Sequence, residues 1–499
     1  MTILTADSSD LAGARRSALP LWIGVAVYAF LLVAGDRLLN DPDSLWQVTL
    51  GQWIIDHRTV PQTDVYSFTM AGQPWISTQW LSQVLLAASY QLAGWAGPVV
   101  LSAAALAATF MLYARWLGQR LRGSTTLVFV AAAVALMAPH MLARPHVLAM
   151  PVMVAWVGAL MAAADRRAAP SFWLLPLMAL WANLHGGFVL GIALVAPIAL
   201  DAVLAAAPSR RLSLLLRWGA FGVAALIVSC ANPYGWHAIL ASQRILSLGA
   251  ALATIGEWAP VNFSRIGAFE VALLAGFGLA LWRGVTLPPV RILLLLGLVH
   301  MALSANRNIE VLALLAPLII AAPLARQIGG AEARGEGPAR GSAAGSLGAV
   351  AAAIALTLGG TLAFASLHRF APHPANSPAA AVTELKKLGV QRVFNDYDFG
   401  GYLIANGVAP FIDGRTELYG ESFVVEQNAA VRLKPPEKLF RLLADYNIDA
   451  TLLRTEDAAT HLLDHIDGWQ KVYSDDVATI HLRRPGAVHS VEPKVTPAK

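Results

Sequence analysis

The chain has 499 residues, of which 57% are hydrophobic and only 13% charged, against about 25% charged in ordinary soluble domains. Several apolar runs approach the ~20 residues that cross a bilayer as a helix, so the composition excludes a soluble globular protein and predicts a polytopic membrane protein. The net charge of +5 comes without a dense basic run, which argues against a nucleic-acid partner. The single cysteine, Cys230, cannot form an intrachain disulfide.

The N-terminal region predicts one span followed by an unusual acidic loop. Residues 1–18 form a polar arm, and residues 19–35 are expected to span the membrane without cleavage, because no persuasive small-residue cleavage site follows them. The loop of residues 36–80 opens with Asp36, Asp41 and Asp43 within eight residues. Inside it, the apolar residues of 44–57 recur at helical spacing, which predicts an amphipathic helix on the membrane surface.

Ten further spans are expected, which makes eleven with the first. They lie near residues 98–117, 126–143, 147–164, 171–185, 187–206, 213–231, 267–282, 288–304, 309–325 and 346–366. Residues 80–94 are apolar but short, which favours a re-entrant or interfacial helix. With a cytoplasmic N-terminus, the inner connections carry fifteen arginines and the outer ones six. This bias places the acidic loop and the C-terminal region outside.

The sequence therefore divides into a cytoplasmic arm at 1–18, a transmembrane domain at 19–366, an extracytoplasmic α/β domain at 367–485 and a polar tail at 486–499. Residues 329–346 are rich in Gly, Ala and charge, which predicts a flexible cytoplasmic linker. In the α/β domain we expect strands at 392–396, 409–413, 450–454, 469–473 and 478–482, and helices at 379–388, 436–446 and 458–465.

Polar residues gather at the outer ends of the expected spans, on the same side as the acidic loop. The candidates for binding a donor phosphate or another part of the substrate are Arg144, His146, His185, Glu257, Arg307 and Asn308. Arginine and histidine at helix ends can also simply reach the headgroups, and the Gly-Gly and Asn-Pro motifs nearby are ordinary helix stops. Both explanations stay open at this point.

Asp41 and Asp43 flank Pro42 in a stiff turn that is followed by aromatic residues, and this pattern points to function. A carboxylate at the membrane surface can act as general base toward an acceptor, and a second can steer the acceptor or hold a divalent cation such as Mg²⁺ or Mn²⁺. Arginine suits bidentate contact with phosphate oxygens. Acids, arginines and apolar walls together predict transfer of a group from a lipid phosphate donor.

The segments DPDSLWQVTLGQWIIDHRTVPQTDVYSFTMAGQPWISTQWL, LWANLHGG, NPYG and FNDYDFGGYL with FIDGRTELYG resemble a group of bacterial GT-C-like membrane proteins. The GT-C superfamily includes protein O-mannosyltransferases and oligosaccharyltransferase catalytic subunits, which use polyprenyl-phosphate-linked sugars. The resemblance implies that Asp41 or Asp43 is the catalytic carboxylate of the loop. It also implies that Arg307 contacts the donor phosphate and that the chain resides in the bacterial inner membrane. The acceptor would be a glycan, a lipid or a protein.

Two motifs of the C-terminal domain add the candidates Asp396, Asp398, Asp413 and Arg415, each beyond an expected strand, where α/β domains collect ligands. A purely structural role stays open, because Asp-Gly and Gly-Gly form turns and Asp413 could pair with Arg415. Two other functions also stay open. A transporter or flippase of lipid-linked glycans would place ionisable groups in the middle of the spans. A noncatalytic scaffold would have no chemical role for the acidic loop.

Overall fold

The computed structural model describes residues 8–246, 249, 256–329 and 343–484, and the chain forms two compact units. The first unit contains residues 1–38, 78–242 and 255–371, and the second contains residues 39–77, 243–254 and 372–499. The structure therefore groups most of the acidic loop with the C-terminal domain, whereas the sequence prediction placed the loop in the transmembrane domain. The linker at 329–346 and the tail at 486–499 fall largely or wholly outside the described residues.

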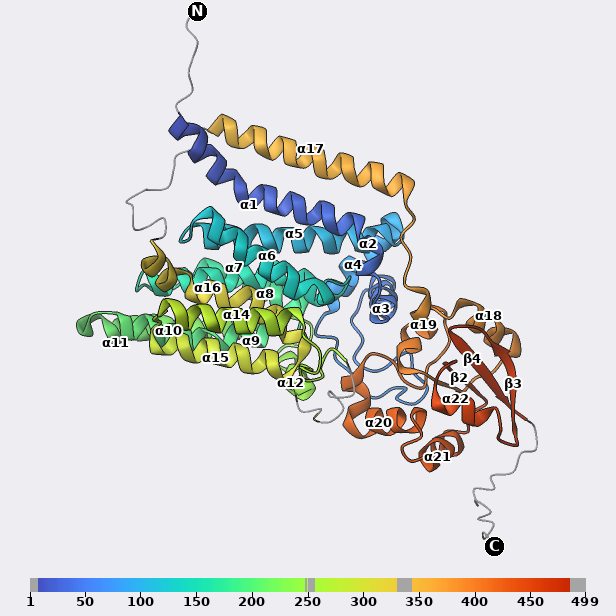
Figure 1. Cartoon of the computed structure of the whole chain (residues 1–499). Helices are drawn as coiled ribbons and strands as arrows, with labels where there is room; N and C mark the ends of the chain where they lie inside the picture. The colour runs from blue at the N-terminus through green and yellow to red at the C-terminus, as the bar shows by residue number, and fades with distance from the viewer. Residues whose placement is uncertain (1–7, 247–248, 250–255, 330–342, 485–499) are drawn as a thin grey trace, which may run out of the picture. The chain divides into compact units, whose positions relative to one another are not determined.

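The first unit is helical. Its longer helices are α1 (Ser8–Val33), α4 (Trp80–Ala93), α5 (Ala96–Gly118), α6 (Gly123–Met137), α7 (Pro145–Asp165), α8 (Leu175–Leu184), α10 (Val195–Ala205), α11 (Pro208–Ser229), α12 (His237–Leu246, which runs into the second unit), α14 (Ala268–Arg283), α15 (Pro289–Ser304), α16 (Ile309–Ile328) and α17 (Ala343–Leu367). The short elements are α2 (Gly35–Leu38), α9 (Phe188–Ala193), η1 (Ala138–His140), η2 (Phe172–Leu174) and η3 (Asn306–Asn308). Helix α1 lies between α5 and α17 (Figure 1).

Each predicted span coincides with a helix or a run of consecutive helices, because long apolar stretches form helices that satisfy their own backbone groups. Seven of these in the described residues are long and apolar enough to cross a membrane. The chain is thus a multi-pass membrane protein, while the count of eleven crossings stays a prediction. Residues 80–94 do form a separate helix, α4, of 14 residues. Helix α1 begins at Ser8 and so includes part of the polar arm.

A buried ion network holds one end of the helix bundle. Arg291 on α15 is 4% exposed and donates to Asp201 on α10, with Nε 2.9 Å from Oδ2, and to Asp165 at the end of α7, with Nη2 2.6 Å from Oδ1. Arg120 approaches the other Asp165 oxygen at 3.3 Å. Two guanidinium groups thus compensate two carboxylates, as buried charges require. Asp201, which the sequence placed within an apolar stretch, is therefore a paired structural group.

The second unit is a small α/β fold. Its elements are α3 (Asp43–His57), η5 (Pro374–Asn376), α18 (Ala379–Leu388), β1 (Val393–Asn395), η6 (Tyr397–Phe399), α19 (Gly400–Ala405), α20 (Thr416–Val431), α21 (Glu437–Asp445), β2 (Ala450–Arg454), α22 (Ala458–Leu463), β3 (Trp469–Ser474) and β4 (Ala478–Arg483). The strand order is β1-β2-β4-β3, with β1 parallel to β2 and the other pairs antiparallel (Figure 1).

Strands β1 and β2 are buried on both faces, and their side chains alternate between two cores. Val393 and Leu452 enter a core with residues of α18 and α19, while their neighbours Phe394 and Leu453 enter a second core with residues of α20, α21 and α22. The predicted helix at 379–388 and the predicted strand at 450–454 have the observed limits. Helix α20 was not predicted from the sequence.

The expected strand at 409–413 is wrong, and one residue explains why. This segment makes only an isolated bridge between Val393 and Pro410, and Pro410 has no backbone N–H for a ladder. The side chain of Asn395 replaces the missing strand contact, because its Oδ1 accepts from the backbone N–H of Phe411 at 2.7 Å. The segment therefore runs beside β1 as a loop that leads directly into Asp413.

Candidate functional site

The predicted site residues fall into two groups, one in each unit. Arg144, His146, His185, Glu257, Arg307 and Asn308 belong to the first unit, and Asp41, Asp43, Asp396, Asp398, Asp413 and Arg415 belong to the second. It therefore stays a prediction that the acids of the loop and Arg307 face one common cavity.

The start of α7 presents the first residues of the group. Arg144 is extended, with φ −127° and ψ 158°, as residues before proline usually are, and Pro145 occupies the first helical position, where its missing N–H costs nothing. Arg144 thus lies just outside the helix while His146 lies in its first turn. The backbone N–H of Ala143 donates to the carbonyl of Leu38 at 2.7 Å, which fixes the approach to the helix.

Arg144 and Arg307 share one carboxylate. Arg144 Nη1 lies 2.5 Å from Glu257 Oε2, and Arg307 Nη1 lies 3.3 Å from Glu257 Oε1. The backbone holds Glu257 in place as well, since the N–H of Arg307 donates to its carbonyl at 2.9 Å. The guanidinium of Arg307 also lies over the ring of Trp258, 4.2 Å from its centroid. Three segments far apart in sequence thus converge at one end of the bundle.

The trio of Arg144, Glu257 and Arg307 contains two cations and one anion. Burial raises the pKa of Glu257, but Arg144 and Arg307 outweigh it and bring the pKa down to about 2. Glu257 is therefore ionised at neutral pH, and two cations face one anion. Two guanidinium groups thus lie side by side in a partly buried setting, an arrangement that suits the binding of an anion.

A second layer of titratable groups lies beside the trio. The rings of His146 and His185 are 6.2 Å apart in an edge-to-face arrangement. His146 Nε2 lies 3.6 Å from an oxygen of Glu310, which is 7% exposed. Sequence reasoning missed Glu310, although an acid in the first turn of the apolar helix α16, directly after Arg307 and Asn308, was a usable signal.

Other members of the group have structural partners. The side chain of Asn308 donates to the carbonyl of Met301 at 3.0 Å and so caps the end of α15. His185 Nδ1 accepts from the backbone N–H of Gly187 at 3.1 Å and closes the turn after α8. The motif at Asn232 is also a helix stop, because its side chain bonds to the backbone of Ser229 and Gly235.

In the second unit, the two acids of the loop differ in their surroundings. Asp41 Oδ1 accepts from the backbone N–H of Asp43 at 2.8 Å and closes the turn before α3. Asp43 Oδ1 accepts from the indole Nε1 of Trp46 at 3.0 Å. Residues 44–48 of α3 are all buried, so the first half of this helix is enclosed on every side rather than amphipathic. Asp41 thus has a local structural use, while a side chain orients Asp43.

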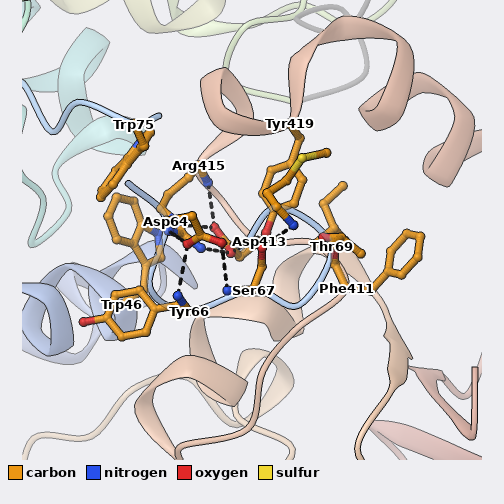
Figure 2. A network of polar contacts seen from close by, with 12 residues as sticks. Trp46, Asp64, Tyr66, Ser67, Thr69, Trp75, Phe411, Asp413, Arg415 and Tyr419 are labelled. Carbon is orange, nitrogen blue, oxygen red and sulfur yellow. Dashed lines mark hydrogen bonds and ion pairs between the residues drawn. The ribbon is translucent and has the colours of Figure 1, made fainter. Parts of the chain in front are cut away.

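A fully buried ion cluster joins the loop to the C-terminal domain (Figure 2). Arg415 and its partners Asp64 and Asp413 are 0%, 3% and 0% exposed. Arg415 Nη1 lies 2.5 Å from Asp64 Oδ1, and its Nη2 lies 2.6 Å from Asp413 Oδ2. Trp75 and Tyr66 cover the guanidinium, with ring centroids 5.1 and 5.4 Å from it. We call the cluster of Asp64, Asp413 and Arg415 the clasp.

The clasp stays charged. Burial lowers the pKa of Arg415, but Asp413 and Asp64 outweigh it and hold the pKa above its ordinary value. The loop adds more contacts: Trp75 Nε1 donates to Glu417 Oε1 at 3.0 Å, and Thr69 Oγ1 donates to the carbonyl of Phe411 at 2.7 Å. The predicted pairing of Asp413 with Arg415 is confirmed. Arg415 also binds Asp64 of the acidic loop, and this contact was not predicted.

Asp396 and Asp398 form a separate group around Arg454, at the end of β1. Arg454 lies 2.8 Å from Asp398 Oδ2 and 3.4 Å from Asp396 Oδ1. Burial and the neighbouring Asp398 raise the pKa of Asp396 to about 7, with Arg454 opposing them. Arg454 also donates to the carbonyl of Ala375 at 3.1 Å and thereby ties β2 to the segment before α18. These contacts describe a structural junction.

In the part of the chain that the structure describes, no three His, Cys, Asp or Glu side chains gather closely enough to hold a metal ion. Asp41 Oδ1 and Asp43 Oδ1 each accept a hydrogen bond. The divalent cation that the sequence suggests at these two acids stays a prediction.

Comparisons with known proteins address the fold. No protein-family description and no curated protein matches the chain. The Archaeoglobus fulgidus oligosaccharyltransferase in its apo form matches with a TM-score of 0.54 and 12% identity, over 94% of this chain and 74% of that chain. The archaeal oligosaccharyltransferase AglB from A. fulgidus, in complex with an inhibitory peptide and a dolichol-phosphate, has a TM-score of 0.49 and 10% identity, over 87% of this chain and 69% of that chain. ArnT from Cupriavidus metallidurans bound to undecaprenyl phosphate has a TM-score of 0.45 and 15% identity, over 94% and 98%.

The match to the apo oligosaccharyltransferase carries the comparison, since its TM-score is above 0.5 and it extends over nearly the whole chain. The chain shares the fold of that oligosaccharyltransferase and has a small C-terminal sheet, so the predicted resemblance is confirmed at the level of fold. Because fold does not fix chemistry, the activity has to be argued from the site.

Proposed function

We propose that this chain is a membrane glycosyltransferase that moves a sugar from a polyprenyl-phosphate-linked donor to an acceptor on the outer side of the membrane. The observation that carries the proposal is the convergence of two guanidinium groups, Arg144 and Arg307, on Glu257 at one end of a helix bundle. A lipid phosphate is an anion that a membrane supplies at its surface. Arginine can bind its oxygens through two N–H groups at once.

The proposed reaction uses Asp43 as general base. An acceptor hydroxyl gives its proton to the Asp43 carboxylate while its oxygen bonds to the anomeric carbon of the sugar. The bond from that carbon to the phosphate oxygen breaks, and the phosphate leaves with the electron pair. Arg144 and Arg307 stabilise the charge that grows on the phosphate. The mechanism requires Asp43 and Arg307 to reach the same donor molecule.

Asp43 is a better candidate than Asp41 for this role. Asp41 closes the turn before α3 through the backbone N–H of Asp43. Asp43 stands in the first turn of α3 with its carboxylate oriented by the Trp46 indole. A base held in one orientation by a neighbouring side chain gives the geometry that proton transfer needs.

A transporter has less support. The sequence places two carboxylates within apolar stretches, Asp201 and Glu270. Asp201 is bound to Arg291, which also binds Asp165, and Glu270 lies in the first turn of α14. A site for a coupling ion or substrate would need such a group to be available near the bilayer centre. In the described helices Asp201 instead stabilises the bundle, and Glu270 stands at a helix end.

The experiment is a complementation series in a strain that lacks the gene, with cell-envelope glycans and glycolipids profiled by mass spectrometry. Asp43→Asn should lower one glycosylated product at least 100-fold at normal protein level, in line with the roughly 10² to 10⁴ that a general base contributes. Asp56→Asn is the matched control, since Asp56 is an exposed acid of the same helix that accepts a hydrogen bond from Gln52. An unchanged profile for Asp43→Asn would refute the proposal.

A further inference from the structure

The contacts around Asp43 point to a role for the C-terminal domain in the chemistry itself. We propose that Gly414 and Trp46, held by the clasp, position the Asp43 carboxylate for proton transfer. The inference rests on the proposed function, since it assigns positioning residues to the base of that reaction. It makes the C-terminal domain a part of the catalytic apparatus rather than a separate acceptor-binding module.

Gly414 is needed for space. A β-carbon at position 414 would lie 1.8 Å from Asp43 Oδ1 and 3.0 Å from Trp46 Nε1. The φ angle of Gly414 lies outside the left-handed region, so its backbone conformation suits any residue. The absence of a side chain therefore serves the close approach of the Asp43 carboxylate to the backbone of the C-terminal domain.

A second glycine holds the other side of the turn. A β-carbon at position 401 would lie 2.5 Å from the carbonyl oxygen of Pro42 and 3.4 Å from Trp46 Cδ1. Gly401 stands in α19, which packs against α3. The turn from Asp41 to Asp43 is thus confined between two backbone segments of the C-terminal domain.

Trp46 fixes the orientation of the carboxylate. Its indole is 2% exposed, packs edge to face on Trp75 with ring centroids 6.3 Å apart, and donates to Asp43 Oδ1. Trp75 in turn donates to Glu417 and covers Arg415. The hydrogen-bond donor for Asp43 is therefore supported by buried contacts to the C-terminal domain.

The clasp explains how the backbone at Gly414 stays in place. Its neighbours in sequence are Asp413 and Arg415, and both are 0% exposed. Arg415 binds Asp64, which belongs to the same loop as Asp43. The cluster thus ties the loop and the backbone at Gly414 together on both sides of the carboxylate. A displacement of about 1 Å at a reacting group can cost about 100-fold in rate.

The test separates turnover from binding in the full-length protein. In the complemented strain we measure the glycosylated product per folded protein, and with purified protein we measure the Kd for undecaprenyl phosphate. Gly414→Ala should lower the product at least tenfold while the Kd changes less than twofold. Trp46→Phe, which keeps an aromatic ring but loses the N–H donor, should lower the product about threefold to tenfold with the same Kd.

Gly407→Ala is the matched control. Gly407 lies in the same domain with a φ of +70° and no atom near its missing side chain, so this change strains the fold without touching Asp43. It should lower protein level or stability but leave the product per folded protein unchanged. If Gly414→Ala fails to fold, Trp46→Phe carries the test.

The outcomes are distinct. If Trp46→Phe and folded Gly414→Ala keep the product of the unsubstituted protein while Asp43→Asn loses it, the positioning role is refuted and the transferase proposal stands. A Kd that rises in parallel with the loss of product would also refute the positioning role. If Asp43→Asn keeps the product, the transferase proposal itself fails.

Discussion

The side chains at the start of α7 and α16 are proposed to bind the phosphate of the donor. Each of the two guanidinium groups is an ordinary helix-end residue by itself, and sequence alone cannot tell such residues from headgroup contacts. Their shared carboxylate, Glu257, changes the interpretation, because it brings the two guanidinium groups together at one place. The charge of each member then predicts a direction of effect on phosphate binding.

The first prediction concerns the opposite charges of Arg307 and Glu257. Arg307→Gln should weaken binding of undecaprenyl phosphate about 10-fold to 100-fold, since hydrogen bonds to charged groups are worth about 1.5–3 kcal/mol. Glu257→Gln should leave binding unchanged or tighten it, because it removes the competing anion. Native mass spectrometry of the purified full-length protein measures both. Equal weakening by the two variants would mean that the trio only stabilises the bundle.

The second prediction concerns pH and Asp396. Burial and Asp398 raise its pKa to about 7, above the ordinary value of 3.8. The unfolded chain therefore loses this proton at lower pH than the folded chain does. Stability from this group is fully present below about pH 4 and is lost as the pH rises through 7. Hydrogen exchange of residues 393–405, corrected for intrinsic rates, should show local opening that increases by up to about tenfold per unit between pH 5 and 7.

The control for this prediction is Asp396→Asn. An amide at position 396 can still accept from the backbone N–H of Asp398, which now binds Asp396 Oδ1 at 3.0 Å. This variant should show a much flatter dependence of opening on pH over the same range. The same slope in both proteins would assign the dependence to another group.

The loop of residues 39–77 is folded into the second unit, and the clasp is its main polar contact. The clasp contains three buried charges beneath the rings of Trp75 and Tyr66, and leaving them unpaired would cost folding free energy. The loop and the domain therefore stabilise each other. The kink of α20 at Gly420, with φ +77°, keeps Tyr419 within reach of Asp413, and its hydroxyl donates to Oδ2 at 2.7 Å.

The third prediction tests the clasp. Asp64→Asn leaves the charge of Arg415 buried with one partner fewer, which should destabilise the docked loop by about 3 kcal/mol. Limited proteolysis within residues 59–73 should then become much faster. Asp56→Asn, an exposed change in the same segment, should alter stability by less than about 0.5 kcal/mol. Equal cleavage rates in the two variants would show that the clasp does not hold the loop.

The whole molecule must satisfy a parity condition. Residues 39–77 and 372–484 belong to one unit, which predicts that both lie on the same side of the membrane. An even number of crossings must then separate them. The predicted ten spans between them meet this condition, whereas counting α4 as an eleventh would break it. The composition of the second unit thus supports a re-entrant or interfacial α4.

The fourth prediction follows from parity. In a Cys230→Ser background, which removes the single cysteine, cysteines introduced as Thr59→Cys and Glu437→Cys occupy exposed positions of the loop and of the C-terminal domain. A membrane-impermeant maleimide should label both from the same side. A tag on the N-terminus should be reached only from the opposite side. Labelling of the two cysteines from opposite sides would contradict the shared unit.

The sequence by itself determined the apolar helices and the strands of the sheet, but not helix α20. Apolar runs fix spans because a bilayer leaves a backbone no other partners, and the limits of β2 match the prediction. It also singled out Arg144, Glu257 and Arg307, because charged residues stand out at the ends of apolar helices. These are local properties, and a local pattern is enough to predict them.

Only the tertiary structure decided which of these residues meet. Glu257 is 113 residues from Arg144, and Asp64 is 351 residues from Arg415, so no spacing rule connects them. The assignment of the acidic loop to the C-terminal unit, the lost strand at Pro410 and the close approach of Gly414 to Asp43 have the same origin. Buried charges and close backbone contacts are satisfied by partners that folding brings together, and those partners leave no periodic trace in the sequence.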